Sequence, residues 1–524
     1  LFFDTFVILD KNAGAAYNKT VTTQRKRESN MERSAGILLP IFSLPSAYGI
    51  GSLGREAREF ANFLHRAGQR WWQIQPVGPT GAGDSPYSSV TTFAGNAFFI
   101  DLDTLAQRGL LTEQELASAR VPQGGRIDYA ALYEGREALL RKAFERIDPA
   151  EAEAARLFRE QTPWLREYAL YLAIKARFGG AAWYDWPDEA LRRHEPAALE
   201  RQKAELAEDI AFHTWVQYCF FTQWESLKAY VNGLGIRIIG DLPIYVSLDS
   251  ADVWSERKEF FLDGRGMPGK VAGVPPDYFC ADGQLWGNPL YDWKAMKQDG
   301  FGWWIRRVEG AARLFDAIRL DHFRAFASYW AVPAGAKTAR EGAWEQGPGM
   351  DLLGVLTSWF PQITYIAEDL GILTEDVHRL RKDSGLPGMK VLEFAFSGPD
   401  NAYLPHQYPD SRCICYTGTH DNDTASGESL RPQVSGRGAG RRPDGVPGAA
   451  AGGPGQHRGA VCGPDAGLPG PGQRGPGECA RRAPGQLELA YGAGQDHRRP
   501  GRCNPGPDPY LRPVLMPLDG RAAS

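Results

Sequence analysis

Several short apolar segments of this chain end in charged residues. Segment 315–320 has the composition of a buried strand, and Asp321 and His322 follow it directly. A buried charge is costly unless it is paired, so packing alone does not explain such an ending. Acidic residues end three further segments in the same way, and the four acids are Asp241, Asp321, Glu368 and Asp421. Because the carboxyl ends of parallel strands meet at one rim of an α/β barrel, we expect these acids to surround one site.

Strand-like and helical segments alternate along most of the chain. Strands are expected over 71–77, 235–245, 315–320, 363–371, 389–396 and 413–423, and an amphipathic helix over 57–67. Repeated strand–helix units predict a parallel sheet. Residues 104–230 show helical periodicity throughout and are expected to form an inserted helical subdomain. The predicted fold class is therefore α/β, a (β/α)8 TIM barrel over residues 34–424 with a helical insertion.

Both ends of the chain differ from this pattern. Residues 1–33 are interpreted as a non-native leader, because 24–31 is rich in residues with purine-rich codons and ends at Met31, the expected natural start. Residues 425–524 are rich in Gly and Pro and contain no Trp and no Lys. Such a composition is not expected to form a core, so this tail is predicted to be disordered or misassigned by a frameshift.

Bulk composition excludes several classes of function. The formal net charge of −4 indicates neither a nucleic-acid-binding surface nor a polybasic membrane surface. No apolar run approaches the length of a membrane helix. The 7 Cys have no disulfide or zinc spacing, which predicts reduced thiols and a cytoplasmic location. The 15 Trp and 20 Tyr are a mild indication of carbohydrate binding, because aromatic faces stack on sugar rings.

Three of the acids suit glycoside chemistry that retains configuration. This chemistry needs one carboxylate as nucleophile and a second carboxyl group, about 5–5.5 Å away, that acts first as acid and then as base. Asp321 is the expected nucleophile, because Arg319 lies two residues earlier on the same strand face and keeps it ionised. Glu368 is the expected acid, with a pKa raised by burial and by the charge of Asp369. Asp421 is expected to hold sugar hydroxyl groups and to favour ring distortion.

Other interpretations of these residues stay open at this point. Each acid taken alone is more often a solvated loop carboxylate or a salt-bridge partner. Acidic triads also bind Mg²⁺, and with His322 and His420 nearby the same residues suit a metal hydrolase. Tyr87, in the turn-rich loop 83–89, is either a turn aromatic that covers the core or a platform for a sugar ring.

Seven motifs, taken in order, resemble the 4-α-glucanotransferase family (amylomaltase, or disproportionating enzyme), relatives of the α-amylases. They fall between about residues 34 and 424 and are 83–88, 240–245 with 249–254, 273–279, 284–293, 319–324, 366–371 and 416–424. The resemblance implies transfer of α-1,4-glucan segments between maltooligosaccharides, or to glucose, without a metal or organic cofactor. It implies roles for Asp321 as nucleophile, Glu368 as acid/base and Asp421 as transition-state stabiliser. It also implies donor-side contacts by Ser85, Tyr87, Asp241, Arg319 and His420, and acceptor-side contacts by Gln284 and Trp286.

The chain departs from the family pattern at Ala82 and in the tail. The family usually carries a bulkier residue before Gly83, and it continues with a strand and a Gly-Asn-Trp-x-Trp-Arg motif that this tail lacks. Read one nucleotide later, suitable codons for 473–478 and 486–495 encode Asn-Glu-Ala-Arg-Val-Asn and Asn-Trp-Asn-Trp-Arg, which are family signatures. The tail is therefore interpreted as a frameshifted translation. Alternatives to the transferase are an α-glucan hydrolase, a debranching-type transferase, or a non-catalytic glucan-binding remnant.

Overall fold

The computed structural model describes residues 4–9, 33–121, 126–277, 280–371, 373–397, 401–408 and 412–421. The chain divides into two compact units, residues 1–487 and 488–524, and every described residue belongs to the first unit. The expected tail over 425–524 lies outside the described residues, and so do Met31 and most of the expected leader.

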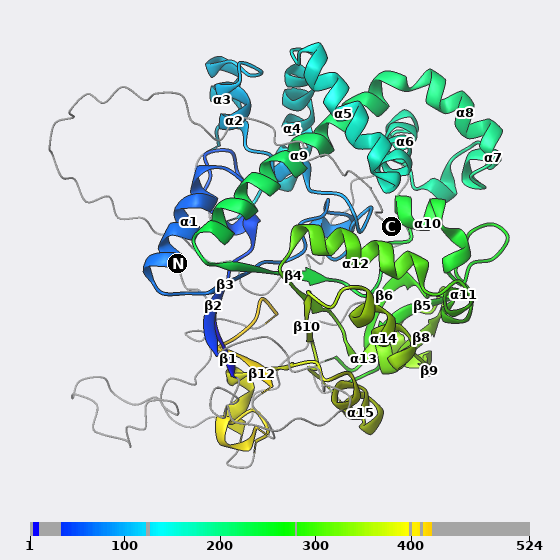
Figure 1. The fold of residues 1–524 in the computed structure, drawn as a ribbon. Helices are drawn as coiled ribbons and strands as arrows, with labels where there is room; N and C mark the ends of the chain where they lie inside the picture. The colour runs from blue at the N-terminus through cyan, green and yellow to red at the C-terminus, as the bar shows by residue number, and fades with distance from the viewer. Residues whose placement is uncertain are drawn as a thin grey trace, which may run out of the picture. The chain divides into compact units, whose positions relative to one another are not determined.

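An eight-stranded sheet lies at the centre of the described fold (Figure 1). Its strands are, in spatial order, β10 (Thr364–Ala367), β7 (Ala317–Leu320), β4 (Arg237–Leu242), β3 (Trp71–Gln73), β2 (Ser34–Leu38), β1 (Asp4–Leu9), β12 (Cys413–Tyr416) and β11 (Gly388–Val391). Neighbouring strands are parallel except for β1, which runs antiparallel to both β2 and β12. The mixed α/β fold with a largely parallel sheet confirms that part of the prediction.

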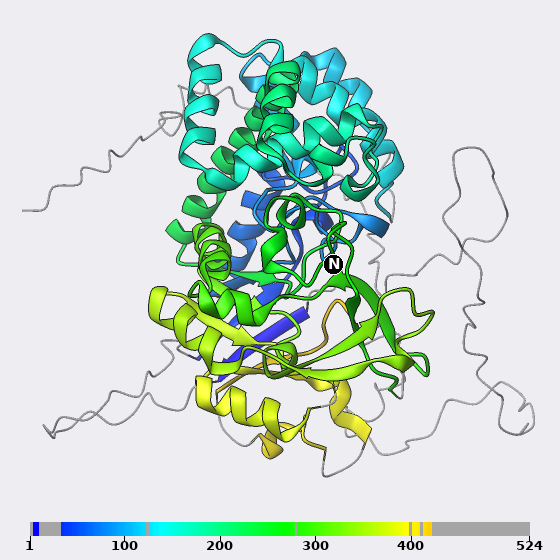
Figure 2. The same ribbon diagram turned by 90° about the vertical axis from the view of Figure 1, so that its right-hand side faces the viewer.

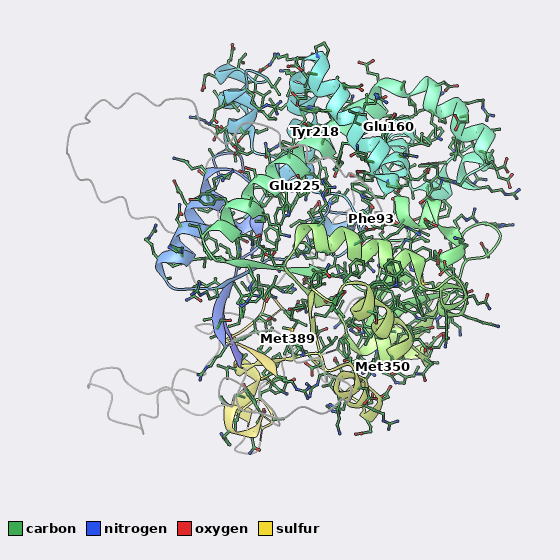
Figure 3. The ribbon with its side chains drawn as sticks, in the orientation of Figure 1. Phe93, Glu160, Tyr218, Glu225, Met350 and Met389 are labelled. Carbon is green, nitrogen blue, oxygen red and sulfur yellow. The ribbon has the colours of Figure 1, made fainter. Side chains whose placement is uncertain are left out.

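Strands β2, β3, β4, β7 and β10 supply side chains to two apolar layers. One buried cluster draws on all eight strands: Phe6, Leu38, Trp71, Ile239, Ala317, Ile366, Met389, Ile414 and Tyr416. Met389 of β11 is labelled in Figure 3. Neighbouring positions such as Ile37, Trp72 and Ile318 belong to the larger cluster that includes the helices. Because successive side chains of a strand point to opposite faces, a strand buried on both sides reads as a continuous apolar run.

Strand β1 lies within the segment that was expected to be a leader outside the fold. The segment contains Thr5, Phe6, Val7 and Ile8, a β-branched and aromatic composition that favours a strand. The Phe6 side chain is fully buried. Residues 4–9 thus have a place in the sheet. Sequence pattern did not predict it, because this strand is separated from the next strand by a long stretch without a strand pattern.

Helices precede the sheet strands and also form a separate group. Helix α1 (Arg55–Arg66) precedes β3, α12 (Gly302–Leu314) precedes β7, α14 (Gly349–Trp359) precedes β10, and α15 (Glu375–Ser384) precedes β11. The separate group contains α2 (Leu102–Gln107), α3 (Glu113–Ala119), α4 (Tyr129–Phe144), α5 (Pro149–Gln161), α6 (Pro163–Arg177), α7 (Glu189–Arg192), α8 (Pro196–Glu205) and α9 (Ala207–Gly233). Figure 1 shows α4 to α8 at the top of the view, and α9 running from this group down toward α1 and β4. In Figure 2 the cyan helices of this group also lie at the top of the view. Among the described residues, no helix has the length and apolar character needed to cross a bilayer.

A second, antiparallel sheet is built from segments on either side of β7. Its strands, in spatial order, are β6 (Gln284–Pro289), β5 (Lys270–Val274), β8 (Ser328–Pro333) and β9 (Ala343–Gln346). Strands β5 and β6 are not among the strands that the sequence pattern predicted. The Gly, Asn and Pro residues of these strands hide the strand signal, and β5 pairs with β8, which lies on the far side of β7 in the sequence.

Most sheet strands are shorter than the sequence pattern suggested. Strand β3 ends at Gln73, β12 ends at Tyr416, and residues 392–397 form a 3₁₀ helix where a strand was expected. As a result, Asp321 and Glu368 lie immediately after β7 and β10 and not within them. Residues just beyond a strand can turn toward a shared site, because their backbone no longer follows the sheet.

Candidate active site

The register of neighbouring parallel strands brings the charged residues together. Asp241 of β4 and Arg319 of β7 are direct partners in the register. Asp321 and Glu368 are the first residues after the neighbouring strands β7 and β10. The Glu368 amide donates to the carbonyl of Leu320 at 3.1 Å, which continues the hydrogen-bonding pattern past the strand ends. The structure thus places two expected acids beside the Asp241–Arg319 pair.

Arg319 joins two carboxylates. Its Nη1 donates to Asp241 Oδ1 at 2.7 Å and to Asp321 Oδ1 at 2.8 Å. Arg319 and Asp241 are both buried. Such close geometry is what offsets the loss of hydration in a buried ion pair. Burial raises the pKa of Asp321, and the charge of Arg319 opposes that shift. The contact between Arg319 and Asp321 is the one that their two-residue spacing predicted.

The Glu368 carboxyl group is held by main-chain amides. The His322 amide donates to Oε2 at 2.7 Å, and the Leu370 amide donates to Oε1 at 3.2 Å. His322 makes this contact with a φ of 48°, a left-handed conformation that is uncommon for a residue other than glycine. Unusual backbone conformations of this kind cluster at functional sites.

The proton affinities of the two neighbouring acids differ. Burial raises the pKa of Glu368 to about 8; the charge of Asp321 adds to this shift, and Arg319 opposes it. Glu368 is therefore protonated at neutral pH. Asp321 has the direct contact with Arg319 and is the ionised member of the pair. One site thus holds an acid and an ionised carboxylate side by side.

Asp369 does not contribute to this shift in the way that the sequence predicted. The expected cause of the raised pKa of Glu368 was burial together with the Asp369 charge, and the second part is wrong. Asp369 Oδ1 accepts from the Met389 amide at 2.6 Å, and its Oδ2 lies 3.1 Å from Arg381 Nε. The Asp369 carboxylate thus contacts Met389 and Arg381 and not Glu368, because the side chains of successive residues after a strand point in different directions.

Tyr87 links the acidic group to β12. Its hydroxyl donates to Asp241 Oδ2 at 2.7 Å and lies 3.1 Å from His420 Nε2. The two rings stack with centroids 5.6 Å apart and an interplanar angle of 14°. A tyrosine hydroxyl has one hydrogen, and Tyr87 donates it to Asp241. We therefore assign to His420 the tautomer that carries a hydrogen on Nε2, so that Nε2 donates to the Tyr87 hydroxyl. Ser85 Oγ accepts from the Tyr87 amide at 3.2 Å, so this side chain shapes the loop that carries Tyr87.

Asp421 stands apart from the other two acids of the expected triad. Its side chain is 71% exposed, and its Oδ1 lies 3.3 Å from His420 Nε2. It is the last described residue of the loop after β12. The structure therefore brings Asp321 and Glu368 together. Within the described part of the chain, Asp421 contacts His420, which contacts Tyr87, and Tyr87 in turn donates to Asp241.

Strand β6 places an aromatic side chain beside the loop that follows Asp321. The Trp286 ring lies edge-to-face against His322 with a centroid distance of 4.8 Å, and the residue is 38% exposed. Trp286 Nε1 donates to Gln284 Oε1 at 3.1 Å. Burial lowers the pKa of His322 to about 4, so this ring is neutral at physiological pH. Gln284 and Trp286 thus contact each other, and Trp286 contacts His322, which directly follows Asp321 in the chain.

A second group behind the site was missed by the sequence analysis. Arg307 of α12 is buried; its Nη1 donates to the carbonyl of Ile244 at 2.8 Å, and its Nη2 donates to the carbonyl of Pro243. Its Nε donates to Thr92 Oγ1 at 2.8 Å. Arg307 therefore ties the loop after Asp241 to the loop after Tyr87. An Arg on the apolar face of an amphipathic helix was the signal that could have revealed it.

The histidines that suggested a metal hydrolase have other contacts. His322 packs against Trp286, and His420 contacts Tyr87. Among residues 4–421, wherever the structure describes them, no three His, Cys, Asp or Glu side chains converge as metal ligands would.

Comparison with known sequences gives one consistent family. Residues 39–428 match the 4-alpha-glucanotransferase family. A 4-alpha-glucanotransferase of Thermus thermophilus is 50% identical over 404 residues, which are 76% of this chain and 80% of the relative. A 4-alpha-glucanotransferase of Aquifex aeolicus is 48% identical over 391 residues, 74% of this chain and 79% of the relative.

Comparison with solved structures agrees with the sequences. The amylomaltase from Streptococcus agalactiae in complex with acarbose has a TM-score of 0.72 and 39% identity, and the match covers 75% of this chain and 80% of that chain. The amylomaltase from Corynebacterium glutamicum has a TM-score of 0.60 at 18% identity over 84% of this chain and 70% of that chain, which supports the fold alone.

Proposed function

The chain belongs to the 4-alpha-glucanotransferase family, and on this premise we propose that it transfers α-1,4-glucan segments between maltooligosaccharides, or to glucose, by a retaining double displacement. The observation that carries the mechanism is the position of Glu368, whose pKa burial raises to about 8, next to Asp321, whose carboxylate accepts a hydrogen bond from Arg319. Retaining transfer needs an acid and a nucleophile in adjacent positions, with pKa values set apart by their surroundings.

The reaction has two displacements at the anomeric carbon. In the first, an Asp321 oxygen attacks this carbon while Glu368 gives its proton to the glycosidic oxygen, so that the shortened glucan leaves and a glucosyl ester remains. In the second, Glu368 takes the proton of the acceptor 4-hydroxyl, whose oxygen attacks the same carbon and releases Asp321. Two inversions leave a new α-1,4 bond, and Glu368 ends protonated as it began.

The donor side of the substrate is assigned to the group around Tyr87. Asp241 and Arg319 offer a carboxylate and a guanidinium at the strand ends, and Tyr87 and His420 form a stacked pair beside them. Ser85 holds the Tyr87 loop in position. Asp421 is proposed to stabilise the transition state by binding sugar hydroxyls, which requires its exposed side chain to turn toward the site when substrate binds.

The acceptor side is assigned to Gln284 and Trp286 on β6. Transfer prevails over hydrolysis only when an acceptor sugar, and not water, meets the glucosyl ester. The partly exposed indole of Trp286 contacts His322, the residue after Asp321. It offers an apolar face on which such a sugar can stack.

The proposal includes a closed eight-stranded barrel, to which residues 34–424 contribute seven parallel strands and residues 4–9 contribute the eighth. In support, the Ala367 amide at the end of β10 donates to the carbonyl of Pro387, just before β11, at 2.9 Å, and these two strands lie at opposite ends of the sheet order. Residues 1–33 are proposed to be a non-native leader, and 425–524 a frameshifted tail. A cytoplasmic location is proposed because the Cys residues that the structure describes are all free thiols.

Product analysis on maltotriose tests the reaction. We expect glucose together with a series of longer maltodextrins; glucose and maltose alone would indicate a hydrolase. Asp321→Asn should lower kcat/KM by about 10³-fold or more, because loss of the nucleophile removes the covalent route. Digestion after trapping with an activated fluoro-sugar should locate the glycosyl adduct on the peptide that contains Asp321.

The matched control is Asp351→Asn. This Asp pairs with Lys297 at the surface, and its side chain is 55% exposed. Its replacement should leave activity and folding unchanged. A normal turnover of Asp321→Asn, or an adduct on another peptide, would refute the assignment of the nucleophile. An inactive, folded protein that binds maltooligosaccharides and forms no adduct would establish the non-catalytic alternative.

A further inference from the structure

Strand β1 occupies a place in the sheet that chain order does not give it. The seven other strands follow one another in space as they do in sequence, from β2 through β3, β4, β7 and β10 on one side, and from β11 to β12 on the other. All of these run parallel to their neighbours. In such a series, the place after β12 and before β2 belongs to a later segment that runs parallel. Residues 4–9 fill it instead, from the other end of the chain and in the antiparallel direction.

The contacts of β1 are those of an interior strand. Phe6 pairs in the register with Tyr416 on one side and with Gly36 on the other. Its ring is fully buried and lies 5.3 Å from the ring of Tyr416. A Cβ atom at Gly36 would lie 2.3 Å from Phe6 Cζ, so the phenyl ring uses the space that this glycine leaves. Tyr416 in turn donates to Gln73 Oε1 at 2.7 Å, which ties the same interior to β3.

The strand beside β1 leads to the candidate active site. Strand β12 ends at Tyr416, and His420 follows in the next loop, where it contacts Tyr87. An unpaired β12 would expose a row of backbone donors and acceptors on one edge. The position of His420 therefore depends on what holds that edge.

We propose that residues 4–9 act as a surrogate strand that completes the sheet between β2 and β12 and so holds the His420 loop in place. The groove between β2 and β12 accepts an extended apolar segment in the antiparallel direction, and its occupant is this segment of the same chain. The inference rests on strand pairing and interior packing, and it stands whether or not the proposed reaction is correct.

Native cysteines make the pairing directly testable. Val7 is the register partner of Cys415, and Leu9 is the register partner of Cys413. In the full-length chain, Val7→Cys should form a disulfide with Cys415 under mild oxidation with diamide, detected by peptide mapping, because opposed positions of antiparallel strands lie within disulfide range. Ile8→Cys is the matched control. Its partner is Ile414, and its position faces the other side of the sheet, so no cross-link to Cys413 or Cys415 should form.

Shortening and substitution test whether the strand matters. A chain that starts at Met31 should show a Tm lower by at least about 3 °C, and Phe6→Asp should show a similar loss, whereas Phe6→Leu should lose less. A synthetic peptide of residues 1–12, added in excess, should restore the Tm of the shortened chain. Failure of Val7→Cys to cross-link with Cys415, or an unchanged Tm after removal of residues 1–30, would overturn the proposal.

Discussion

The two neighbouring carboxyl groups that are proposed as acid and nucleophile differ in their contacts. Asp321 meets Arg319 directly, at 2.8 Å. In the part of the chain that the structure describes, the Glu368 carboxyl group accepts hydrogen bonds from the main-chain amides of His322 and Leu370. A full positive charge favours ionisation of a carboxyl group more than two neutral amides do. We therefore expect Asp321 to be ionised and Glu368 to carry the proton. The backbone turn at His322 is what allows this arrangement, since it supplies one of the two amides.

The raised pKa of Glu368 predicts a pH dependence of activity. Its pKa of about 8 exceeds the ordinary value of 4.5, so the carboxyl group can donate a proton up to about pH 8 and loses this ability above it. The rate of maltotriose disproportionation should therefore fall as pH rises through 8. The substitution Glu368→Gln should lower this rate by about 10²-fold or more. A pH–rate profile that stays flat to pH 10 would contradict this role.

The same shift links Glu368 to stability. A group whose pKa is raised in the folded state stabilises that state fully below its unfolded value of 4.5, and this contribution is lost as pH rises through about 8. In Asp321→Asn, the neighbouring negative charge is absent, so the protonation midpoint of Glu368 should move to lower pH. Infrared titration of the carboxyl band measures this midpoint, and Asp351→Asn should leave it in place.

At the scale of elements, β6 of the second sheet places Trp286, the proposed acceptor-side residue, against His322, which follows β7 of the first sheet. Trp286→Ala should raise the ratio of hydrolysis to transfer several-fold, because water replaces the acceptor sugar at the glucosyl ester. The measurement is the ratio of free reducing ends to longer maltodextrins at equal substrate consumption. Trp359→Ala is the control: this indole lies at the end of α14 and is 64% exposed. An equal ratio of hydrolysis to transfer in both variants would refute the assignment of Trp286 to the acceptor side.

The packing of β4 against its neighbours is equally specific. A Cβ atom at Gly240 would lie 2.1 Å from the ring of Phe315, which is buried. Gly240→Ala should therefore destabilise the protein by about 1–3 kcal/mol, and it should lower activity because Asp241 is the next residue. Gly135→Ala in α4, where nothing lies within 4 Å, should instead stabilise by about 0.5–1 kcal/mol. Urea unfolding compares the two, and equal effects would show that the ring moves freely.

Sequence pattern predicted the elements of the site better than their connections. The strand-end acids Asp321 and Glu368 were found because charges directly after apolar runs are rare without a function. The role of Asp369 was wrong, since spacing alone cannot tell in which direction a residue leaves a strand. Arg307 was missed because its hydrogen-bond acceptors, the carbonyls of Pro243 and Ile244, lie in a loop that is far from it in sequence. The second sheet was missed because β5 and β8 pair across a long separation in sequence.

At the scale of the whole molecule, the proposed closure of the sheet would decide whether the site persists. The interior cluster takes at least one side chain from each of the eight strands. Removal of any strand would leave two open edges and a gap in this cluster. The family resemblance places the closing strand after residue 424, where the frame of this chain is proposed to change, and residues 4–9 take that place here.

Two segments therefore compete for one place, and restoring the reading frame tests this. A chain whose frame is moved by one nucleotide after about codon 424 keeps residues 1–421 but gains the family's closing strand. In that chain, the Val7→Cys cross-link to Cys415 should disappear, and removal of residues 1–30 should leave the Tm unchanged, because a parallel strand now pairs with β2 and β12. In the chain as it stands, the cross-link should form and the same removal should lower the Tm. Equal cross-linking yields in both chains would show that residues 4–9 hold their place regardless of the tail, and that the altered frame does not leave the sheet open.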